Sequence, residues 1–185
     1  MRILVASDSY GGSMAQAVVE HLRASRPDIE VEDRGVQPAY YTAAYAMAAE
    51  VEAAAAAGLT DTRAVLCCGS GQGMCIVANK FLHVYAALCT TPEAAAGCRS
   101  VNNANVLCLG GRVTRADDGR KILDAWLATE LGEGWEPPIQ EFIRTSMAEI
   151  PALDFSPAAA ARLATAAAAE RQRQHAQPAE QVAKH

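Results

Sequence analysis

The sequence predicts an α/β fold, a Rossmann-like three-layer sandwich in which helices cover both faces of a five-stranded parallel sheet. Short apolar runs typical of buried strands alternate along the chain with longer segments that have helical character. Several of the strand-like runs end in glycine-rich or polar turns, and this alternation favours parallel strands joined by helical crossovers. In such folds the ligand lies beyond the carboxyl ends of the strands, so the residues that follow each strand are the candidates for a site.

Five segments are expected to be strands because they are short and rich in apolar residues. They are residues 2–7 (RILVAS), 29–31, 64–68 (AVLCC), 84–89 (VYAALC) and 105–109 (NVLCL). The third is followed by Gly-Ser-Gly-Gln-Gly and the fifth by Gly-Gly, which are turn sequences.

The helices expected between these strands are residues 13–25, 42–57, 74–80, 92–101 and 117–130. The first and last carry apolar residues at helical spacing, and the second is alanine-rich without a helix breaker. The third continues from the glycine-rich turn. The fourth has Thr91 as an N-cap and Pro92 at its first position, where the missing N–H costs nothing.

The composition changes near Ser156, so we expect two parts: a domain over residues 1–150 and an extension over 151–185. Residues 157–174 are mostly alanine with scattered Arg and Glu, which predicts a helix. Residues 176–185 are polar and are expected to lack a stable structure.

The composition also limits the function. The formal net charge is −5 with no basic stripe, which argues against a nucleic-acid partner. No apolar run approaches the roughly 20 residues of a membrane span, and the chain start is too short an apolar run for a secretory signal, so we expect a cytoplasmic protein without a membrane partner. The six cysteines form no C-x-x-C pair and the four histidines show no ligand spacing, so neither a disulfide framework nor a metal site is expected.

The sharpest feature is Cys68 with the loop Gly69-Ser70-Gly71-Gln72-Gly73, between a strand and a helix. A dinucleotide-binding turn fits poorly because the spacing is G-x-G-x-G after the third strand, and a Walker loop would need Gly-Lys-Ser/Thr. The third interpretation is a loop that holds an oxyanion beside a basic or nucleophilic cysteine, since its N–H groups and the helix N-terminus favour negative charge.

Three other positions are ambiguous from the residues alone. Asp8 ends the first strand and could be a turn or N-cap residue as readily as a functional one. Asn102, Asn103 and Asn105 are turn formers by composition, and Arg112 could be an ordinary surface arginine.

The loop beginning at Cys68, together with Ala78-Asn79-Lys80 and the segment Val101-Asn-Asn-Ala-Asn-Val-Leu-Cys-Leu-Gly-Gly-Arg-Val113, resembles the ribose-5-phosphate isomerase B / galactose-6-phosphate isomerase family. The resemblance runs from about residue 1 to residue 147. It implies an aldose–ketose isomerase, an intramolecular oxidoreductase that needs no cofactor. It also implies a homodimer with shared active sites, a tetramer being the alternative.

The resemblance implies a role for each candidate residue. The catalytic group would be Cys68, Asp8, Ser70 and Asn102, with Cys68 moving a proton between C1 and C2 of a phosphorylated sugar through a cis-enediolate, and with Asn102 supplied by the neighbouring subunit. The substrate-binding group would be Ser9, Gly69, Gly71, Gly73, Arg112 and Arg144, with Arg112 on the phosphate.

The chain departs from the family pattern where Ser9 and Val101 replace two histidines, the second associated with sugar-ring opening. Residues 132–144 hold a single arginine, Arg144, where the family has two. The hypothesis is therefore an acyclic substrate such as a tetrose or tetrulose 4-phosphate, because such a sugar needs no ring-opening acid. The alternatives are a ribose 5-phosphate isomerase, a galactose-6-phosphate isomerase subunit, and a non-catalytic protein that binds sugar phosphates.

Overall fold

A computed structural model describes residues 1–176, and the chain divides into two compact units, Met1–Pro151 and Ala152–His185. Within the described residues, none of the helices is both long enough and apolar enough to span a bilayer. The candidate site lies in the first unit, so most of the description concerns that unit.

The first unit is built on the predicted five-stranded, all-parallel sheet. The strands are β1 (Arg2–Ser7), β2 (Glu30–Val36), β3 (Thr62–Cys68), β4 (Ala86–Leu88) and β5 (Val106–Gly110), in the spatial order β2-β1-β3-β5-β4. Ser7 pairs with Cys67, and Cys68 pairs with Gly110, so the three central strands end at one level. The chain leaves β1 toward β2 on one side and returns to β3 on the other, which opens a crevice beyond the carboxyl ends of β1 and β3.

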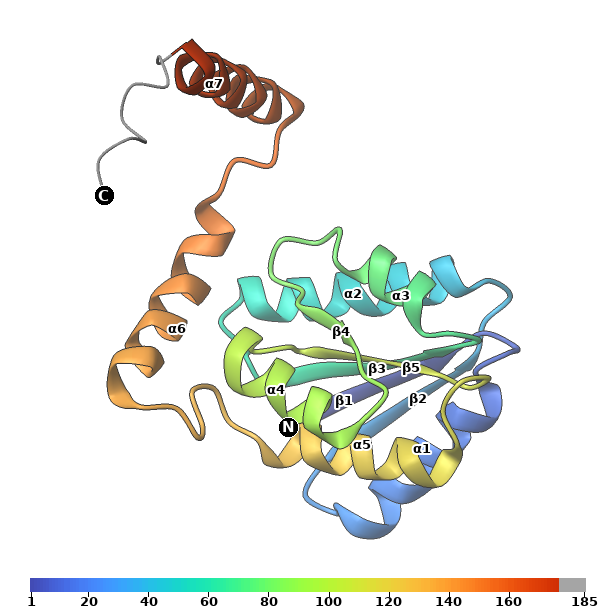
Figure 1. Cartoon of the computed structure of the whole chain (residues 1–185). Helices are drawn as coiled ribbons and strands as arrows, with labels where there is room; N and C mark the ends of the chain where they lie inside the picture. The colour runs from blue at the N-terminus through green and yellow to red at the C-terminus, as the bar shows by residue number, and fades with distance from the viewer. Residues whose placement is uncertain (177–185) are drawn as a thin grey trace. The chain divides into compact units, whose positions relative to one another are not determined.

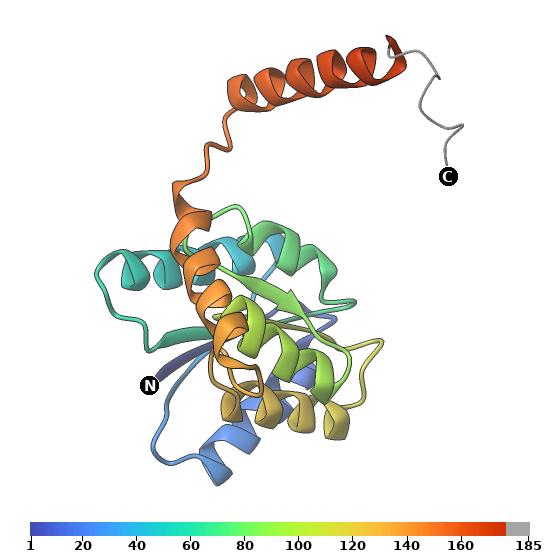
Figure 2. The ribbon, with the colours of Figure 1, turned by 60° about the vertical axis from the view of Figure 1, so that its left-hand side comes forward.

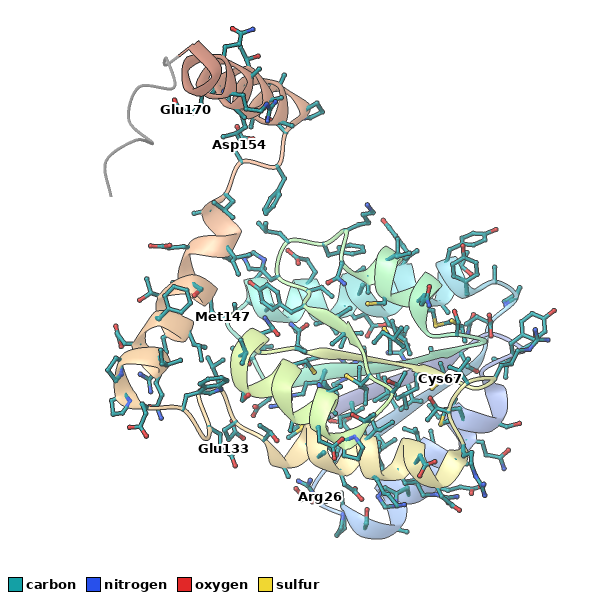
Figure 3. The ribbon with its side chains drawn as sticks, viewed as in Figure 1. Arg26, Cys67, Glu133, Met147, Asp154 and Glu170 are labelled. Atoms are coloured by element: carbon teal, nitrogen blue, oxygen red, sulfur yellow. The ribbon has the colours of Figure 1, made fainter. Side chains whose placement is uncertain are left out.

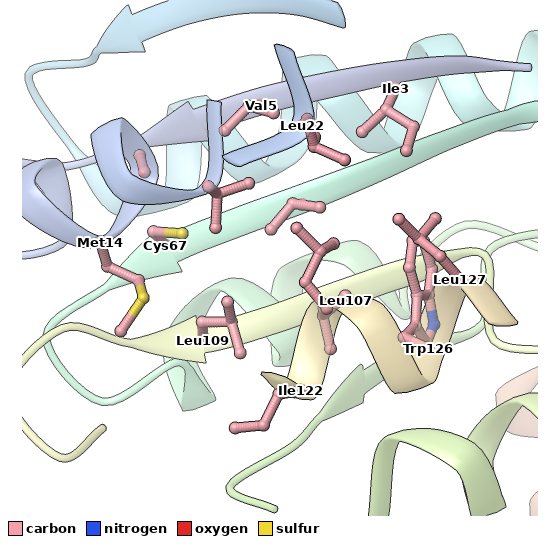
Figure 4. Close-up of a cluster of buried hydrophobic side chains, with 14 of the residues drawn as sticks. Ile3, Val5, Met14, Leu22, Cys67, Leu107, Leu109, Ile122, Trp126 and Leu127 are labelled. Atoms are coloured by element: carbon pink, nitrogen blue, oxygen red, sulfur yellow. The ribbon is translucent and has the colours of Figure 1, made fainter. Parts of the chain in front are cut away.

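Helices cover both faces of the sheet, as predicted (Figure 1). One face carries α1 (Gly12–Ser25), α4 (Pro92–Asn102) and α5 (Ala116–Ala128), and the other carries α2 (Tyr40–Ala56) and α3 (Gln72–Ala78). Alternate residues of β1 divide between the two layers: Ile3 packs with α1 and α5, and Leu4 packs with α2. Figure 4 shows the first layer, in which Trp126 is fully buried. Burying a side chain of this size stabilises the fold by about 1.5–3 kcal/mol, which holds the strand ends in place.

Three elements differ from the sequence-based expectation. β2 extends to Val36 because it is an edge strand whose polar residues face solvent, so no apolar pattern marked it. β4 is only Ala86–Leu88, half of the expected run, and lies at the other edge. The helix α6 (Pro137–Glu149) was not expected at all; it lies beside α4, as Figure 2 shows, and it buries one residue, Ile143.

The second unit contains α7 (Pro157–Ala176), which begins where the sequence predicted. Asp154 accepts a hydrogen bond from Arg162 at 3.0 Å near the start of this helix. Of the residues 176–185 expected to lack structure, Ala176 instead ends α7, because the alanine-rich helix continues two residues further than expected. The other nine lie outside the described residues.

Candidate active site

Cys68 is the last residue of β3 and is 5% exposed. The N–H of Gly71 donates a hydrogen bond to its sulfur at an N···S distance of 3.1 Å. Since a sulfur anion is a stronger acceptor than a thiol, this bond suits an ionised Cys68. Figure 3 labels the neighbouring Cys67 near the ends of the strands, where the site lies. The cysteine is therefore placed at the crevice edge with a backbone donor aimed at it.

The loop after Cys68 requires glycine at its turning point. Gly71 has φ +79°, a left-handed conformation that other residues adopt at a cost. A Cβ atom on Gly71 would also lie 2.5 Å from Leu88 Cδ1 and 3.3 Å from the nitrogen of Gly110. The loop is thus packed against β4 and the end of β5, which fixes the direction of the Gly71 N–H.

The loop offers fewer free donors than the sequence suggested. The Gly71 N–H is used by Cys68, and the Gln72 N–H donates to Ser70 Oγ at 3.4 Å. Gly73 lies in the first turn of α3, where N–H groups have no acceptor within the helix. The donor left to meet a ligand is therefore the Gly73 N–H, with the exposed Ser70 hydroxyl next to it.

Asp8 follows β1 and is 8% exposed beside the end of β3, where its N–H donates to the carbonyl of Cys67 at 3.2 Å. Its Oδ1 accepts the N–H groups of Tyr10 and Gly11, both at 2.9 Å. Asp8 therefore shapes the turn and is not the N-cap of α1, which is Gly11. This arrangement engages Oδ1, and Oδ2 is the oxygen left for a ligand. Ser9 is exposed next to it.

Arg112 follows β5 and joins the same edge of the sheet. Its N–H donates to the carbonyl of Gly69 at 3.0 Å, and the Gly111 N–H donates to the carbonyl of Cys68 at 2.8 Å. The Arg112 guanidinium lies over the ring of Tyr10, with Cζ 3.9 Å from the ring centroid. The structure thus brings Arg112 to Cys68, and it adds Tyr10.

Two tyrosines were overlooked in the sequence. Tyr10 contacts Arg112, and Tyr40 at the start of α2 lies against Gly73, where an added Cβ would be 2.7 Å from Tyr40 Cε2. Both follow the end of a strand, Tyr10 after β1 and Tyr40 after β2. Their position after strands that end at the crevice edge was the signal that could have identified them.

Asn102 and Arg144 do not join this cluster. Asn102 ends α4, and the chain then runs through β5, whose five residues span about 16 Å, before it reaches the level of Cys68. The Gly132 N–H donates to the carbonyl of Ser100 at 2.7 Å, so the segment that leads into α6 lies at the same end as Asn102. Arg144 is exposed on α6 and donates to Gln140 at 3.2 Å.

A second thiol, Cys75 on α3, has an unexpected character. A hydrogen bond from Cys108 lowers the pKa of Cys75 to about 7, and its side chain is only partly buried. By contrast, burial raises the pKa of Cys67, which behaves as the small hydrophobe expected of most cysteines in the chain. Within residues 1–176 no cluster of three or more His, Cys, Asp or Glu side chains is arranged to hold a metal ion.

Comparison with known proteins places this geometry in a family. The model of the Ribose/Galactose Isomerase family matches residues 3–139. An Arabidopsis thaliana DNA damage-repair/toleration protein, DRT102, is 35% identical over 81% of the chain, and the chain spans about half (49%) of its length. A 4-deoxy-4-sulfo-D-erythrose isomerase of Clostridium is 33% identical over 84% of the chain and 97% of that protein. A D-erythrulose-4-phosphate isomerase of Pectobacterium atrosepticum is 32% identical over 77% of the chain and 93% of that protein.

A solved structure agrees with these matches. Ribose-5-phosphate isomerase B from Mycoplasma genitalium, with ribulose 5-phosphate bound, superposes with a TM-score of 0.67 at 31% identity, covering 80% of this chain and 94% of that chain. The matched region contains the sheet, the Cys68 loop and Arg112, and it ends before α7. From this agreement of sequence and fold, the chain belongs to the ribose/galactose isomerase family of aldose–ketose isomerases.

Proposed function

We propose that this protein interconverts a phosphorylated aldose and ketose, with Cys68 as the base. The observation that carries the proposal is the Cys68 sulfur at the crevice edge, 3.1 Å from the Gly71 nitrogen. A thiolate there can take the proton from C2 of the aldose and return it to C1, while the hydroxyl proton passes from O2 to O1. Positioned proton transfer of this kind contributes about 10²–10⁴-fold to rate.

The other groups at this edge suit the remaining steps. Asp8 Oδ2 is available to exchange a proton with the substrate hydroxyls, because Oδ1 is engaged by two backbone N–H groups. The Gly73 N–H and the Ser70 hydroxyl are donors for the enediolate oxygen. Fixed donors aimed at the developing oxyanion lower the barrier because they need no reorganisation. Arg112 supplies the positive charge for the phosphate.

We further propose that the active enzyme is a homodimer in which each site takes Asn102 and Arg144 from the partner. These two residues lie at the opposite end of the sheet from Cys68 in the same chain, so a single chain does not assemble the full set. A two-fold axis between copies would bring one chain's Asn102 to the other chain's Cys68 without any change of fold.

Subunit complementation tests this sharing. Cys68→Ala and Asn102→Ala, each inactive alone, are co-expressed with different tags and the hybrid is purified. A hybrid dimer has one site with both defects and one intact site, so we expect about half of the wild-type turnover per dimer. A hybrid as inactive as its parents would contradict a shared site.

The substrate that this site favours is an acyclic four-carbon sugar phosphate. Val101 precedes Asn102 and has no proton to transfer, so the site lacks a ring-opening acid at this position. A sugar with phosphate on C4 has no free O4 to close a furanose, and it therefore needs no such acid. Two relatives that match nearly their whole length are named for four-carbon sugars, which supports this choice.

The decisive measurement is kcat/KM for D-erythrulose 4-phosphate and for ribose 5-phosphate with the same preparation. The proposal expects a preference for the tetrulose of at least about tenfold, a difference of about 1.4 kcal/mol in transition-state binding. The variant Val101→His is the matched control and is expected to narrow the gap by raising turnover of the pentose. A clear preference of the wild type for ribose 5-phosphate would refute the four-carbon assignment.

A further inference from the structure

The turn after β1 places an aromatic ring on the arginine that faces the site. Tyr10 is 57% exposed, and its ring lies 3.9 Å from Arg112 Cζ. At this separation the guanidinium rests on the ring face, the geometry of a cation–π contact. An exposed tyrosine at this position has no packing role in the core, so its contact with Arg112 is the main interaction of its ring.

The backbone around the pair is fixed on both sides. Asp8 Oδ1 holds the Tyr10 N–H at 2.9 Å, and the Arg112 N–H is held by Gly69 at 3.0 Å. A Cβ atom on Gly111 would lie only 2.6 Å from the Tyr10 carbonyl oxygen. The two turns are therefore in direct contact, and the ring and the guanidinium meet because their backbones do.

The Arg112 side chain also passes beside the residue that follows Cys68. A Cβ atom on Gly69 would lie 3.7 Å from Arg112 Cδ and 3.5 Å from Tyr10 Cβ. Within residues 1–176, no carboxylate forms an ion pair with Arg112 and no hydrogen bond engages its guanidinium. Its N–H donors are free for an oxyanion, while one face of the group rests on Tyr10.

We propose that Tyr10 is a positioning residue that holds Arg112 beside the Cys68 loop in the orientation that binds the phosphate of the substrate. The proposal rests on the proposed function and adds a residue that sets substrate affinity. A stacked guanidinium loses less freedom when it binds a phosphate, because the ring has already restricted its rotation. The ring acts on binding, so its removal raises KM and leaves kcat nearly unchanged.

The test compares Tyr10→Leu, which keeps apolar bulk without a π face, with Tyr10→Phe, which keeps the ring. We expect Tyr10→Leu to raise KM for the sugar phosphate about two- to fivefold, the range of an exposed cation–π contact, and Tyr10→Phe to stay near wild type. In an Arg112→Ala background, Tyr10→Leu should change KM no further, because its effect acts through the arginine. Equal KM effects of Tyr10→Leu with and without Arg112, or a Tyr10→Phe variant as weak as Tyr10→Leu, would overturn the proposal.

Binding of inorganic phosphate, followed by NMR titration, separates this proposal from the proposed function. A weaker phosphate affinity in Tyr10→Leu, restored in Tyr10→Phe, supports the positioning role even if the wild type isomerises no sugar phosphate tested. An unchanged phosphate affinity in Tyr10→Leu overturns the positioning role even if the wild type is an active isomerase.

Discussion

At the residue scale, the candidate site depends on one short contact, the Gly71 N–H on the Cys68 sulfur. The sequence predicted a cysteine beside a glycine loop because strand, cysteine and glycines follow one another directly. It did not predict that Gly71 serves the sulfur while Gly73 remains for the ligand, because both glycines look equivalent in the pattern. The difference comes from the left-handed backbone of Gly71, which only the structure shows.

Gly71→Ala tests the role of this turn. The added methyl group would lie 2.5 Å from Leu88 Cδ1 in a left-handed conformation, so we expect a loss of about 1–3 kcal/mol in the free energy of unfolding and loss of turnover. Gly97→Ala on α4 is the matched control: no atom lies within 4 Å of its added Cβ, and alanine should stabilise the helix by about 0.5–1 kcal/mol. Urea unfolding of both variants gives the comparison, and equal stability of the two would contradict the packing described.

The pH dependence of alkylation tests the Cys75 thiol. Its pKa of about 7 means that the thiolate is the minor form below neutral pH and the major form above it, so its iodoacetamide rate should rise through a midpoint near pH 7. Since the Cys108 hydrogen bond lowers the pKa, Cys108→Ala should move this midpoint to higher pH. Peptide mass spectrometry assigns the modified cysteine. An unmoved midpoint would contradict the Cys108 contact, and any labelling test of Cys68 needs Cys75→Ala as background.

At the element scale, the pattern of strands and helices was predictable where burial is one-sided or complete. β1 is apolar throughout and was predicted with its observed bounds, Arg2–Ser7. β2 was cut short because an edge strand exposes polar residues, and α6 was missed because its first turn holds two prolines and it buries one residue, Ile143. Local sequence signals were sufficient for helix starts such as Thr91, whose Oγ1 accepts the Ala94 N–H at 3.2 Å.

The Thr91 cap predicts a measurable loss of stability. Thr91→Ala removes the acceptor of the Ala94 N–H at the start of α4 and should lower the free energy of unfolding by about 1 kcal/mol. Thr91→Ser keeps the hydroxyl oxygen and should stay within a few tenths of a kcal/mol of wild type. Thermal or urea unfolding distinguishes them, and indistinguishable Ala and Ser variants would mean that the cap contributes nothing.

At the scale of the whole molecule, the strand order explains which candidates meet. Asp8, Cys68 and Arg112 follow β1, β3 and β5, which are neighbours in the sheet, so the rule about carboxyl ends predicted their meeting. Asn102 precedes β5 and lies at the other end, which fits a site completed by a second copy. Tyr10 escaped the sequence analysis because stacking on Arg112 depends on two turns that are distant in sequence.

The division into two units predicts the result of truncation. A chain that ends at Pro151 retains both cores of the sheet, since their buried residues all lie before that point. We expect its free energy of unfolding to stay within about 0.5 kcal/mol of that of the full chain. Circular dichroism should show less helix because α7 is missing. A much lower unfolding temperature would show that the second unit stabilises the first.

The most direct test of the central claim is the effect of Cys68→Ala on isomerisation of the preferred sugar phosphate, beside Cys75→Ala as the matched control. If Cys68 is the base, kcat/KM should fall by about 10²–10⁴-fold in Cys68→Ala, with the unfolding curve retained. Cys75→Ala should keep most of the activity, because Cys75 lies on α3 and is not among the residues that follow the ends of β1, β3 and β5. A Cys68→Ala enzyme that isomerises the substrate as fast as the wild type would contradict the account.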